Sequence, residues 1–170
     1  MTPLDSVQLI DVEASGLHLE SYPVEVAILT AGARISSWLI APEPEWTHWS
    51  REAERLHGLP RARLELEGVR PSVVVRQLSS LLARSNGIMY SDAAEWDFDW
   101  IKTLYLAVGA TLDFQILPLQ ELLSEAQWQA LKVERERLRR SGLYELHRAA
   151  SDVRMLHAAY QCAVRLGSIR

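Results

Sequence analysis

The order of its apolar segments most constrains what this chain can fold into. Three strand-like segments come first, at residues 6–11, 22–32 and 33–42. In the second segment apolar residues alternate with polar or small ones, which is typical of a β-strand. Gly32 separates the second segment from the third, and Pro42 ends the third. These two segments are therefore predicted to form an antiparallel hairpin.

The rest of the chain alternates between helical and strand-like patterns. Two further strands are predicted at residues 87–92 and 111–117, and helices are predicted at 51–57, 70–85, 95–109, 118–140 and 146–166. A three-strand meander followed by this alternation predicts an α/β fold in which helices flank a mixed five-stranded sheet. The length of 170 residues fits a single domain over residues 1–170.

Composition and charge exclude several classes of protein. Hydrophobic residues make up 48% of the chain, so it is not intrinsically disordered. The single cysteine, Cys162, excludes an intrachain disulfide and a thiolate metal site. The net charge of −4 argues against a protein that coats nucleic acid through bulk positive charge, but it is compatible with local binding of a strand end. Without a signal-peptide pattern or an apolar run of about 18 to 20 residues, we expect a soluble cytoplasmic protein that makes no membrane contact.

Four carboxylates and one histidine stand out by their positions. Asp11 and Glu13 follow the first apolar run and point to one face of a strand, because side chains alternate along it. Asp97 lies in the first turn of a predicted helix, and Asp152 borders the apolar stripe of the last one. Charges beside a buried face are costly unless they are paired or bound to a metal, and Mg²⁺ and Mn²⁺ prefer such oxygen ligands. His147, five residues before Asp152, suits a general base that works near neutral pH.

Three motifs that contain these residues resemble those of the DnaQ-like, DEDDh-type 3′–5′ exonucleases. "LIDVEASGL" at residues 9–17 is similar to the first motif, a hydrophobic strand that leads into Asp-x-Glu-x-x-Gly-Leu. "EWDFDWI" at 95–101 resembles the second motif, and "HRAASD" at 147–152 matches the His-x-Ala-x-x-Asp of the third. "RLHGLP" at 55–60 resembles a His-Gly segment that lies between the first two. One such motif occurs often by chance, but three in the family's order are specific.

The resemblance implies a ribonuclease H-like fold and hydrolysis of phosphodiester bonds from a 3′ end. Asp11, Glu13, Asp97 and Asp152 would hold two divalent cations, Mg²⁺ or Mn²⁺, and His147 would act as the general base. The implied products are nucleoside 5′-monophosphates released from single-stranded nucleic acid.

Further residues are implied on the substrate side. Ala14, Ser15, Gly16 and Leu17 would approach the terminal nucleotide by their backbone and by an apolar wedge. His57, in the His-Gly segment, is expected to be structural, with a role beside the substrate as the alternative. Because many relatives pair, a homodimer is a further expectation.

The second motif departs from the family pattern. Where the family usually has Asn four residues before its Asp, this chain has Ala93, preceded by Asp92. A substrate contact is therefore lost or replaced. Asp99 lies two residues beyond Asp97, but the aromatic residues around Asp97 favour Asp97 as the ligand.

The substrate remains open at this point. The pattern at residues 147–154 also resembles oligoribonucleases, which favours RNA or short oligoribonucleotides. The alternatives are a DNA exonuclease of repair or proofreading and a catalytically silent module that binds nucleic acid or protein. Trp46 and Trp49 could stack bases or belong to the core. The charged run at 132–140 could flank substrate phosphates or form a solvated helix face.

Overall fold

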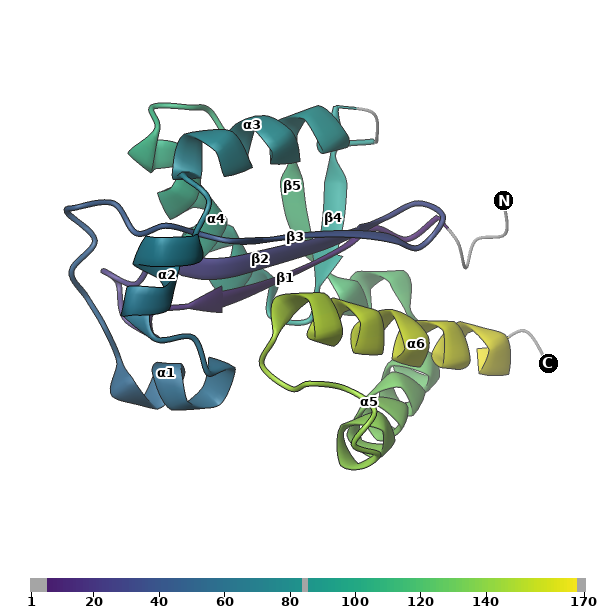
Figure 1. Ribbon diagram of the computed structural model, residues 1–170. Coiled ribbons are helices and arrows are strands. Elements are labelled where there is room, and N and C mark those ends of the chain that lie inside the picture. The colour runs from purple at the N-terminus through teal and green to yellow at the C-terminus, as the bar shows by residue number, and fades with distance from the viewer. Residues whose placement is uncertain (1–5, 84–85, 168–170) are drawn as a thin grey trace.

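A five-stranded mixed sheet forms the middle layer of the computed structural model, which describes residues 6–83 and 86–167 (Figure 1). The strand order is β3-β2-β1-β4-β5. The strands are β1 (Leu9–Ala14), β2 (Pro23–Thr30), β3 (Arg34–Leu39), β4 (Ile88–Ser91) and β5 (Gln115–Pro118). β1, β2 and β3 form an antiparallel meander, and β4 and β5 continue the sheet in parallel to β1. The predicted mixed sheet, including its hairpin, is confirmed.

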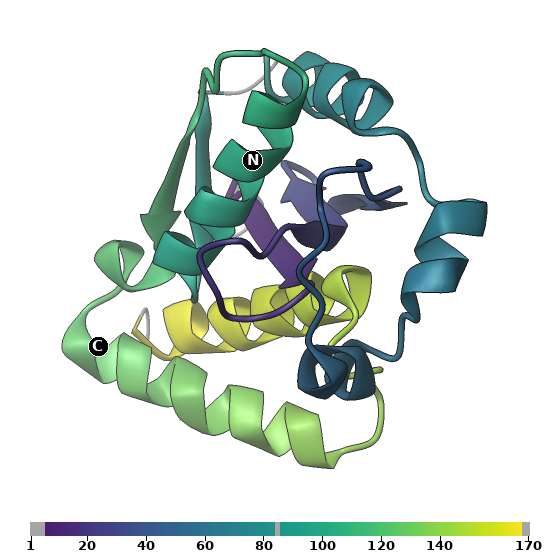
Figure 2. The ribbon, with the colours of Figure 1, turned by 90° about the vertical axis from the view of Figure 1, so that its left-hand side faces the viewer.

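Helices cover both faces of this sheet (Figure 2). They are α1 (Arg51–His57), α2 (Arg61–Glu67), α3 (Pro71–Leu82), α4 (Ala94–Ala107), α5 (Glu125–Arg140) and α6 (Ala149–Gly167). α3 and α4 pack on one face and α5 and α6 on the other, so each face has its own apolar core.

The alternation of side chains along β1 assigns its two acids to one of these faces. Ile10 and Val12 belong to the core beneath α3 and α4, whereas Leu9 belongs to the core beneath α6. Asp11 and Glu13 share the orientation of Leu9, because residues two apart point the same way. Both acids therefore lie on the α6 side of the sheet.

Several helix ends follow from local chemistry as predicted. Ser50 caps α1 by accepting a hydrogen bond from the Ala53 amide, with 3.3 Å between N and Oγ. Gly58 ends α1 with φ of +66°, a left-handed conformation that glycine adopts without strain. α3 begins at Pro71, and its predicted end includes residues 84–85, which lie outside the described part of the chain.

α2 is a helix that the sequence analysis missed. Only Leu64 is buried among its seven residues, so the segment has no apolar period to detect. Two ion pairs between successive turns help to stabilise the helix instead. Arg61 pairs with Glu65 at 3.1 Å, and Arg63 pairs with Glu67 at 2.9 Å.

The predicted helix at 118–140 is wrong at its start. Pro118 ends β5 in an extended conformation, and a 3₁₀ turn at Leu119–Leu122 follows it. α5 begins only at Glu125, where Ser124 and Gln127 form a capping box. Proline fits the first turn of a helix, but here its fixed φ serves the end of a strand equally well.

Two further boundaries differ from prediction, and both concern candidate residues. β1 runs to Ala14 instead of ending at Asp11, because β2 pairs with it through Ala14, with a bulge between Glu13 and Ala14. α6 begins at Ala149 instead of residue 146, so His147 precedes the helix.

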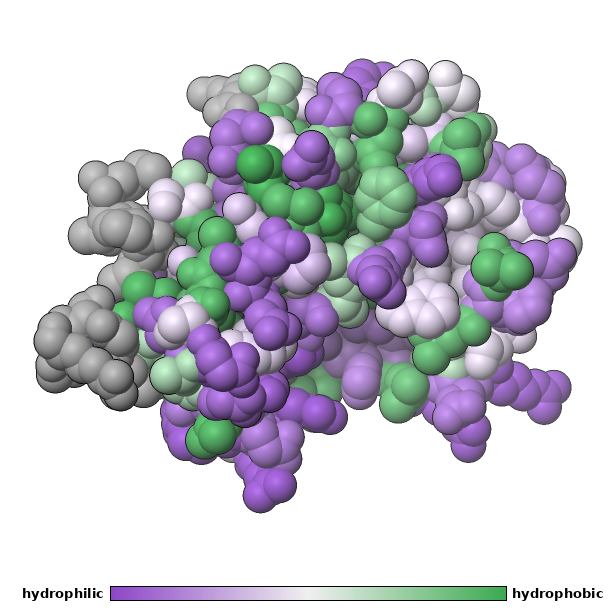
Figure 3. All heavy atoms as spheres, turned by 180° about the vertical axis from the view of Figure 1, so that it is seen from behind, coloured by the Kyte–Doolittle hydropathy of each residue, from purple (hydrophilic) through white to green (hydrophobic). Residues whose placement is uncertain are grey.

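Seen from behind, the surface mixes polar and apolar side chains over the whole visible face (Figure 3). Within the part of the chain that the structure describes, no helix combines the length and the apolar character needed to cross a bilayer.

Candidate active site

The parallel pairing of β1 and β4 brings the first two acidic segments to one edge of the sheet. Leu9 pairs with Tyr90, so two residues further along Asp11 lies level with Asp92, just beyond the end of β4. α4 starts immediately afterwards, and Asp97 lies in its first turn as predicted.

Asp97 is held in a buried position by hydrogen bonds. Its side chain is 2% exposed, and the Ser91 hydroxyl donates a hydrogen bond to its Oδ2. Burial raises the pKa of Asp97 well above its ordinary value, while the bonds from Ser91 and from the Val12 backbone oppose that rise.

α6 and the segment just before it add the remaining two candidate residues. The helix packs on the face of β1 that carries Glu13, and Asp152 lies in its first turn. Oδ2 of Asp152 accepts a hydrogen bond from the backbone amide of His147 at 2.8 Å. Glu13, His147 and Asp152 each present one potential ligand atom, and these three atoms lie within 4.8 Å of one another. The first and third motifs therefore meet in space.

Neighbouring carboxylates add to the effect of burial on the pKa of Asp11 and Glu13. Burial is the largest cause for Asp11, and Asp97, Glu13 and Asp152 raise its pKa further. Burial and the neighbouring Asp152 raise the pKa of Glu13 to about 8. Like charges at such distances repel unless protons or cations neutralise them.

The donor set fits a hard divalent cation. Oδ2 of Asp11 and Oδ1 of Asp152 are buried, and neither has a hydrogen-bond partner among the residues that the structure describes. An unpaired buried carboxylate oxygen is costly, and a cation such as Mg²⁺ or Mn²⁺ would remove that cost.

Glu25 is a buried acid beside the cluster that the sequence analysis did not single out. It is 3% exposed and lies directly opposite Glu13 in the ladder between β1 and β2, where two like charges destabilise a sheet. Arg148 offsets this with two hydrogen bonds to Glu25, from Nε at 3.0 Å and from Nη2 at 3.1 Å. The Ala149 amide donates a third at 3.1 Å. The only signal in the sequence was an acid in the middle of an otherwise apolar strand.

The charged run at 132–140 is mostly a solvated face of α5, with one exception. Arg137 and Arg140 pair with glutamates one turn earlier on the same helix. Arg135 instead crosses to Asp92, at the edge of the carboxylate cluster. No short motif in the sequence connects these two positions, which lie 43 residues apart.

The predicted substrate-side loop is largely engaged within the protein. The Ser15 amide donates to the Tyr22 carbonyl at 2.9 Å, and the Ser15 carbonyl accepts from the Ser50 amide at 2.8 Å. Ala14 and Gly16 are also buried. Leu17 is 73% exposed, so of these four residues it is the one whose side chain is open to a ligand.

Contacts between aromatic rings favour structural roles for two further candidates. Trp46 is 9% exposed and stacks on Tyr22, with ring centroids 5.0 Å apart. His57 is 3% exposed and meets the edge of Trp49, with centroids 6.1 Å apart. Its Nδ1 accepts a hydrogen bond from the Leu59 amide at 3.1 Å.

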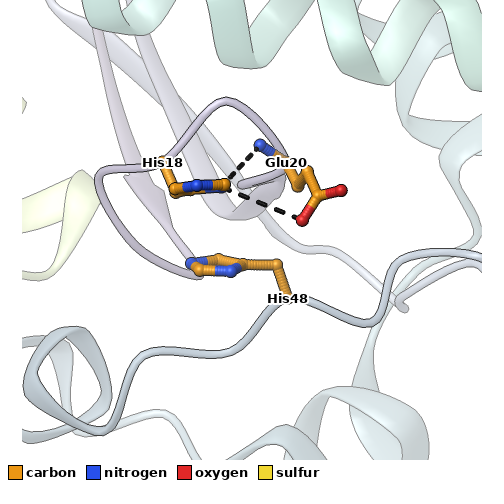
Figure 4. Close-up of side chains that lie close together, drawn as sticks. All are labelled: His18, Glu20 and His48. Carbon is orange, nitrogen blue, oxygen red and sulfur yellow. Dashed lines mark hydrogen bonds and ion pairs between the residues drawn. The ribbon is translucent and has the colours of Figure 1, made fainter.

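A second group of potential ligands lies outside this cluster, on two loops (Figure 4). The rings of His18 and His48 stack with centroids 4.9 Å apart and planes 19° apart, and Glu20 lies beside them. The Glu20 amide donates to Nδ1 of His18 at 3.3 Å. Lone pairs of imidazole nitrogens lie in the ring plane, so two nearly parallel rings do not direct them at one point. The group is a stacked pair of rings, and it does not form a metal site in this arrangement.

Solved structures of E. coli exonuclease I share the arrangement of the sheet and its helices. The complex with a dA16 oligonucleotide matches with a TM-score of 0.71 over 94% of this chain and 40% of that chain, at 14% identity. The fold is that of the matched part of exonuclease I. The zinc-bound form of its complex with single-stranded DNA matches with a TM-score of 0.71 over 96% of this chain and 42% of that chain, also at 14% identity. The expected ribonuclease H-like fold is thus confirmed.

The similarity concerns the fold, and it covers only part of each exonuclease I chain. This chain spans about two fifths of the exonuclease I chains that it matches. No family model and no curated protein matches the sequence.

Proposed function

We propose that this chain is a metal-dependent 3′–5′ exonuclease that acts on single-stranded nucleic acid. The gathering of Asp11, Glu13, Asp97 and Asp152 beside His147 carries the proposal, because these acids come from three separate elements and two of them keep unpaired buried oxygens. The fold of exonuclease I, which was crystallised with single-stranded oligonucleotides, supports the proposed substrate class.

Each residue has a role in this proposal. Asp11, Glu13, Asp97 and Asp152 would hold two divalent cations, Mg²⁺ or Mn²⁺, which supply Lewis acidity for the attacking water and the departing 3′ oxygen. An imidazole nitrogen of His147 takes the proton of that water. The bond from its backbone amide to Asp152 keeps His147 beside the acids. The exposed side chain of Leu17 packs against the terminal nucleotide.

We also propose which nucleic acid, RNA or DNA, the protein prefers as its substrate. The oligoribonuclease-like pattern at 147–154 favours RNA or short oligoribonucleotides. DNA is the second candidate, favoured by the dA16 and dT13 oligonucleotides bound in exonuclease I.

One digestion experiment tests these proposals. RNA and DNA 20-mers of matched sequence, labelled at the 5′ end, are incubated with the full chain in Mg²⁺, in Mn²⁺ or in EDTA, and the products are resolved by length. We expect a ladder that shortens from the 3′ end, stronger for RNA, and no products in EDTA. Asp11→Ala and His147→Ala should abolish it.

Two outcomes would contradict the proposal. Full activity in both variants would remove these residues from the mechanism. Absence of digestion together with absence of divalent-cation binding in calorimetry would favour a catalytically silent binding module.

A further inference from the structure

Two arginines lie next to the carboxylate cluster, and each is bound to an acid outside it. Arg148 binds Glu25 on β2, and Arg135 binds Asp92 after β4. Both acceptors are shielded, since the Glu25 side chain is 5% exposed and the Asp92 side chain is 11% exposed. The two ion pairs therefore flank the four candidate ligands without including any of them.

Both arginines are close enough to act on the cluster electrostatically. Burial dominates the raised pKa of Glu13, and Arg148 is the neighbour that lowers it. Burial likewise dominates the raised pKa of Asp152, and Arg135 is among the groups that lower it. Glu13 and Asp152 are thus each within the electrostatic influence of one of these arginines.

Arg135 and Asp152 each keep one buried polar atom unpaired among the described residues. Nε of Arg135 and Oδ1 of Asp152 are both buried, and neither has a hydrogen-bond partner among the described residues. A guanidinium binds carboxylates through two parallel hydrogen bonds and is more weakly hydrated than an ammonium group. If Arg135 were released, Asp152 would be an available acceptor, and a divalent cation would have to compete with it.

We propose that Asp92 and Glu25 are positioning residues that hold Arg135 and Arg148 away from the carboxylate cluster and so keep Glu13 and Asp152 free for divalent cations. The inference rests on the proposed function, because it assumes that the cluster binds cations. It assigns a role to Asp92 in this chain at the place where the second motif departs from the family pattern.

A double-mutant cycle on Asp92 and Arg135 tests the proposal without any measurement of activity. Asp92→Asn keeps the size of the side chain and removes its charge, and Arg135→Met keeps the apolar stem and removes the guanidinium. Calorimetry with Mn²⁺ is carried out on the metal-free full chain, on each single variant and on the double variant. Circular dichroism and thermal unfolding establish that each variant is folded.

The expected pattern is non-additive. Asp92→Asn should weaken Mn²⁺ binding by about tenfold or more, because the freed guanidinium occupies a ligand carboxylate. Arg135→Met alone should leave the Mn²⁺ affinity within about threefold of that of the unmodified chain. The double variant should return to within about threefold of the unmodified chain, because the competitor is absent.

Three results would overturn the proposal. Unchanged Mn²⁺ affinity in Asp92→Asn would show that Asp92 restrains nothing. A double variant as weak as Asp92→Asn would show that Asp92 acts on the cation directly. Additive effects of the two changes would show that the charges act independently through space.

A second cycle, with Glu25→Gln and Arg148→Met, applies the same test if Asp92→Asn does not fold. The proposed function fails separately, since it requires the unmodified chain to bind Mn²⁺. If the unmodified chain binds Mn²⁺ and neither cycle shows coupling, the positioning role alone is wrong.

Discussion

The backbone amide of His147 donates a hydrogen bond to the side chain of Asp152, with 2.8 Å between N and Oδ2. One oxygen of Asp152 thereby fixes His147, two residues before the start of α6, and the other is left without a hydrogen-bond partner among the described residues. A single side chain thus combines a contact at the start of the helix with a buried oxygen that is available to a ligand. His147 has φ of +58°, a left-handed conformation that is unfavourable for a non-glycine residue, and this bond helps to stabilise it.

Two substitutions distinguish the hydrogen bond of Asp152 from its negative charge. Asp152→Asn keeps an oxygen for the His147 amide, whereas Asp152→Ala does not. Both remove the charge, so we expect both to lower the digestion rate at least about 100-fold. Thermal unfolding should show Asp152→Ala to be less stable than Asp152→Asn by about 1 to 2 kcal/mol, because only the alanine variant loses the hydrogen bond. Equal stability of the two variants would contradict the structural role of this bond.

A pair of neighbouring acids on α4 provides a matched test of the second motif. Asp97 is 2% exposed and bonded to Ser91, whereas Asp99 is exposed on the same helix. We expect Asp97→Asn to abolish Mn²⁺-dependent digestion and Asp99→Asn to leave the rate within about twofold of the unmodified chain, since surface changes are usually neutral. If Asp99→Asn proved to be the inactive variant, the second motif would have to be reassigned.

The raised pKa of Glu13 predicts how the stability of the metal-free protein depends on pH. The folded state binds this proton more tightly than the unfolded state, because the pKa of about 8 exceeds the ordinary value of 4.5. Its contribution to stability is complete below about 4.5 and is lost as the pH rises to 8. In EDTA, the melting temperature of the unmodified chain should fall between pH 6.5 and 8 relative to that of Glu13→Gln.

The measurement begins at pH 6.5 because His57 affects the stability at lower pH. Burial lowers the pKa of His57, so its contribution has the opposite slope below about pH 6.5. A melting temperature that rises with pH between 6.5 and 8 relative to Glu13→Gln would contradict the assignment for Glu13.

Gly68 is predicted to tolerate no side chain. A Cβ at this position would lie 2.3 Å from the Leu64 carbonyl oxygen and 2.4 Å from the Ala41 amide nitrogen. Both are backbone atoms, so Gly68→Ala must shift α2 or the chain next to β3. We expect a loss of about 1 to 3 kcal/mol in the free energy of unfolding. Urea titration measures this loss. As a control, Leu66→Ala changes a residue that is 84% exposed and should leave the free energy of unfolding unchanged.

The sheet and the positions of the acids were predictable because each has a local signature. Alternating apolar residues indicate strands from the local sequence, and Asp11 and Glu13 lie on one of these strands. The grouping of Asp11 with Asp97 was predicted from the resemblance of the motifs to those of the exonuclease family.

Features that depend on charged partners far away in the sequence were not predictable in this way. α2 is supported by ion pairs instead of an apolar stripe, and its bounds carry no periodic signal. The pairing of Arg135 with Asp92 depends on how α5 is placed relative to the end of β4, which no local pattern specifies. The burial of Trp46 against Tyr22 depends in the same way on the packing of two separate loops.

The acids of the cluster come from both ends of the described chain. They are therefore synthesised at different times during translation. Glu13 and Asp152 are separated by roughly 140 residues. A ribosome adds about 5 to 20 residues per second, so the first acids emerge roughly 7 to 30 s before the helix that brings the last one. Until α6 docks, a nascent polypeptide holds Asp11 and Glu13 without His147 or Asp152, and the complete set of side chains exists only after nearly all of the described chain has been translated.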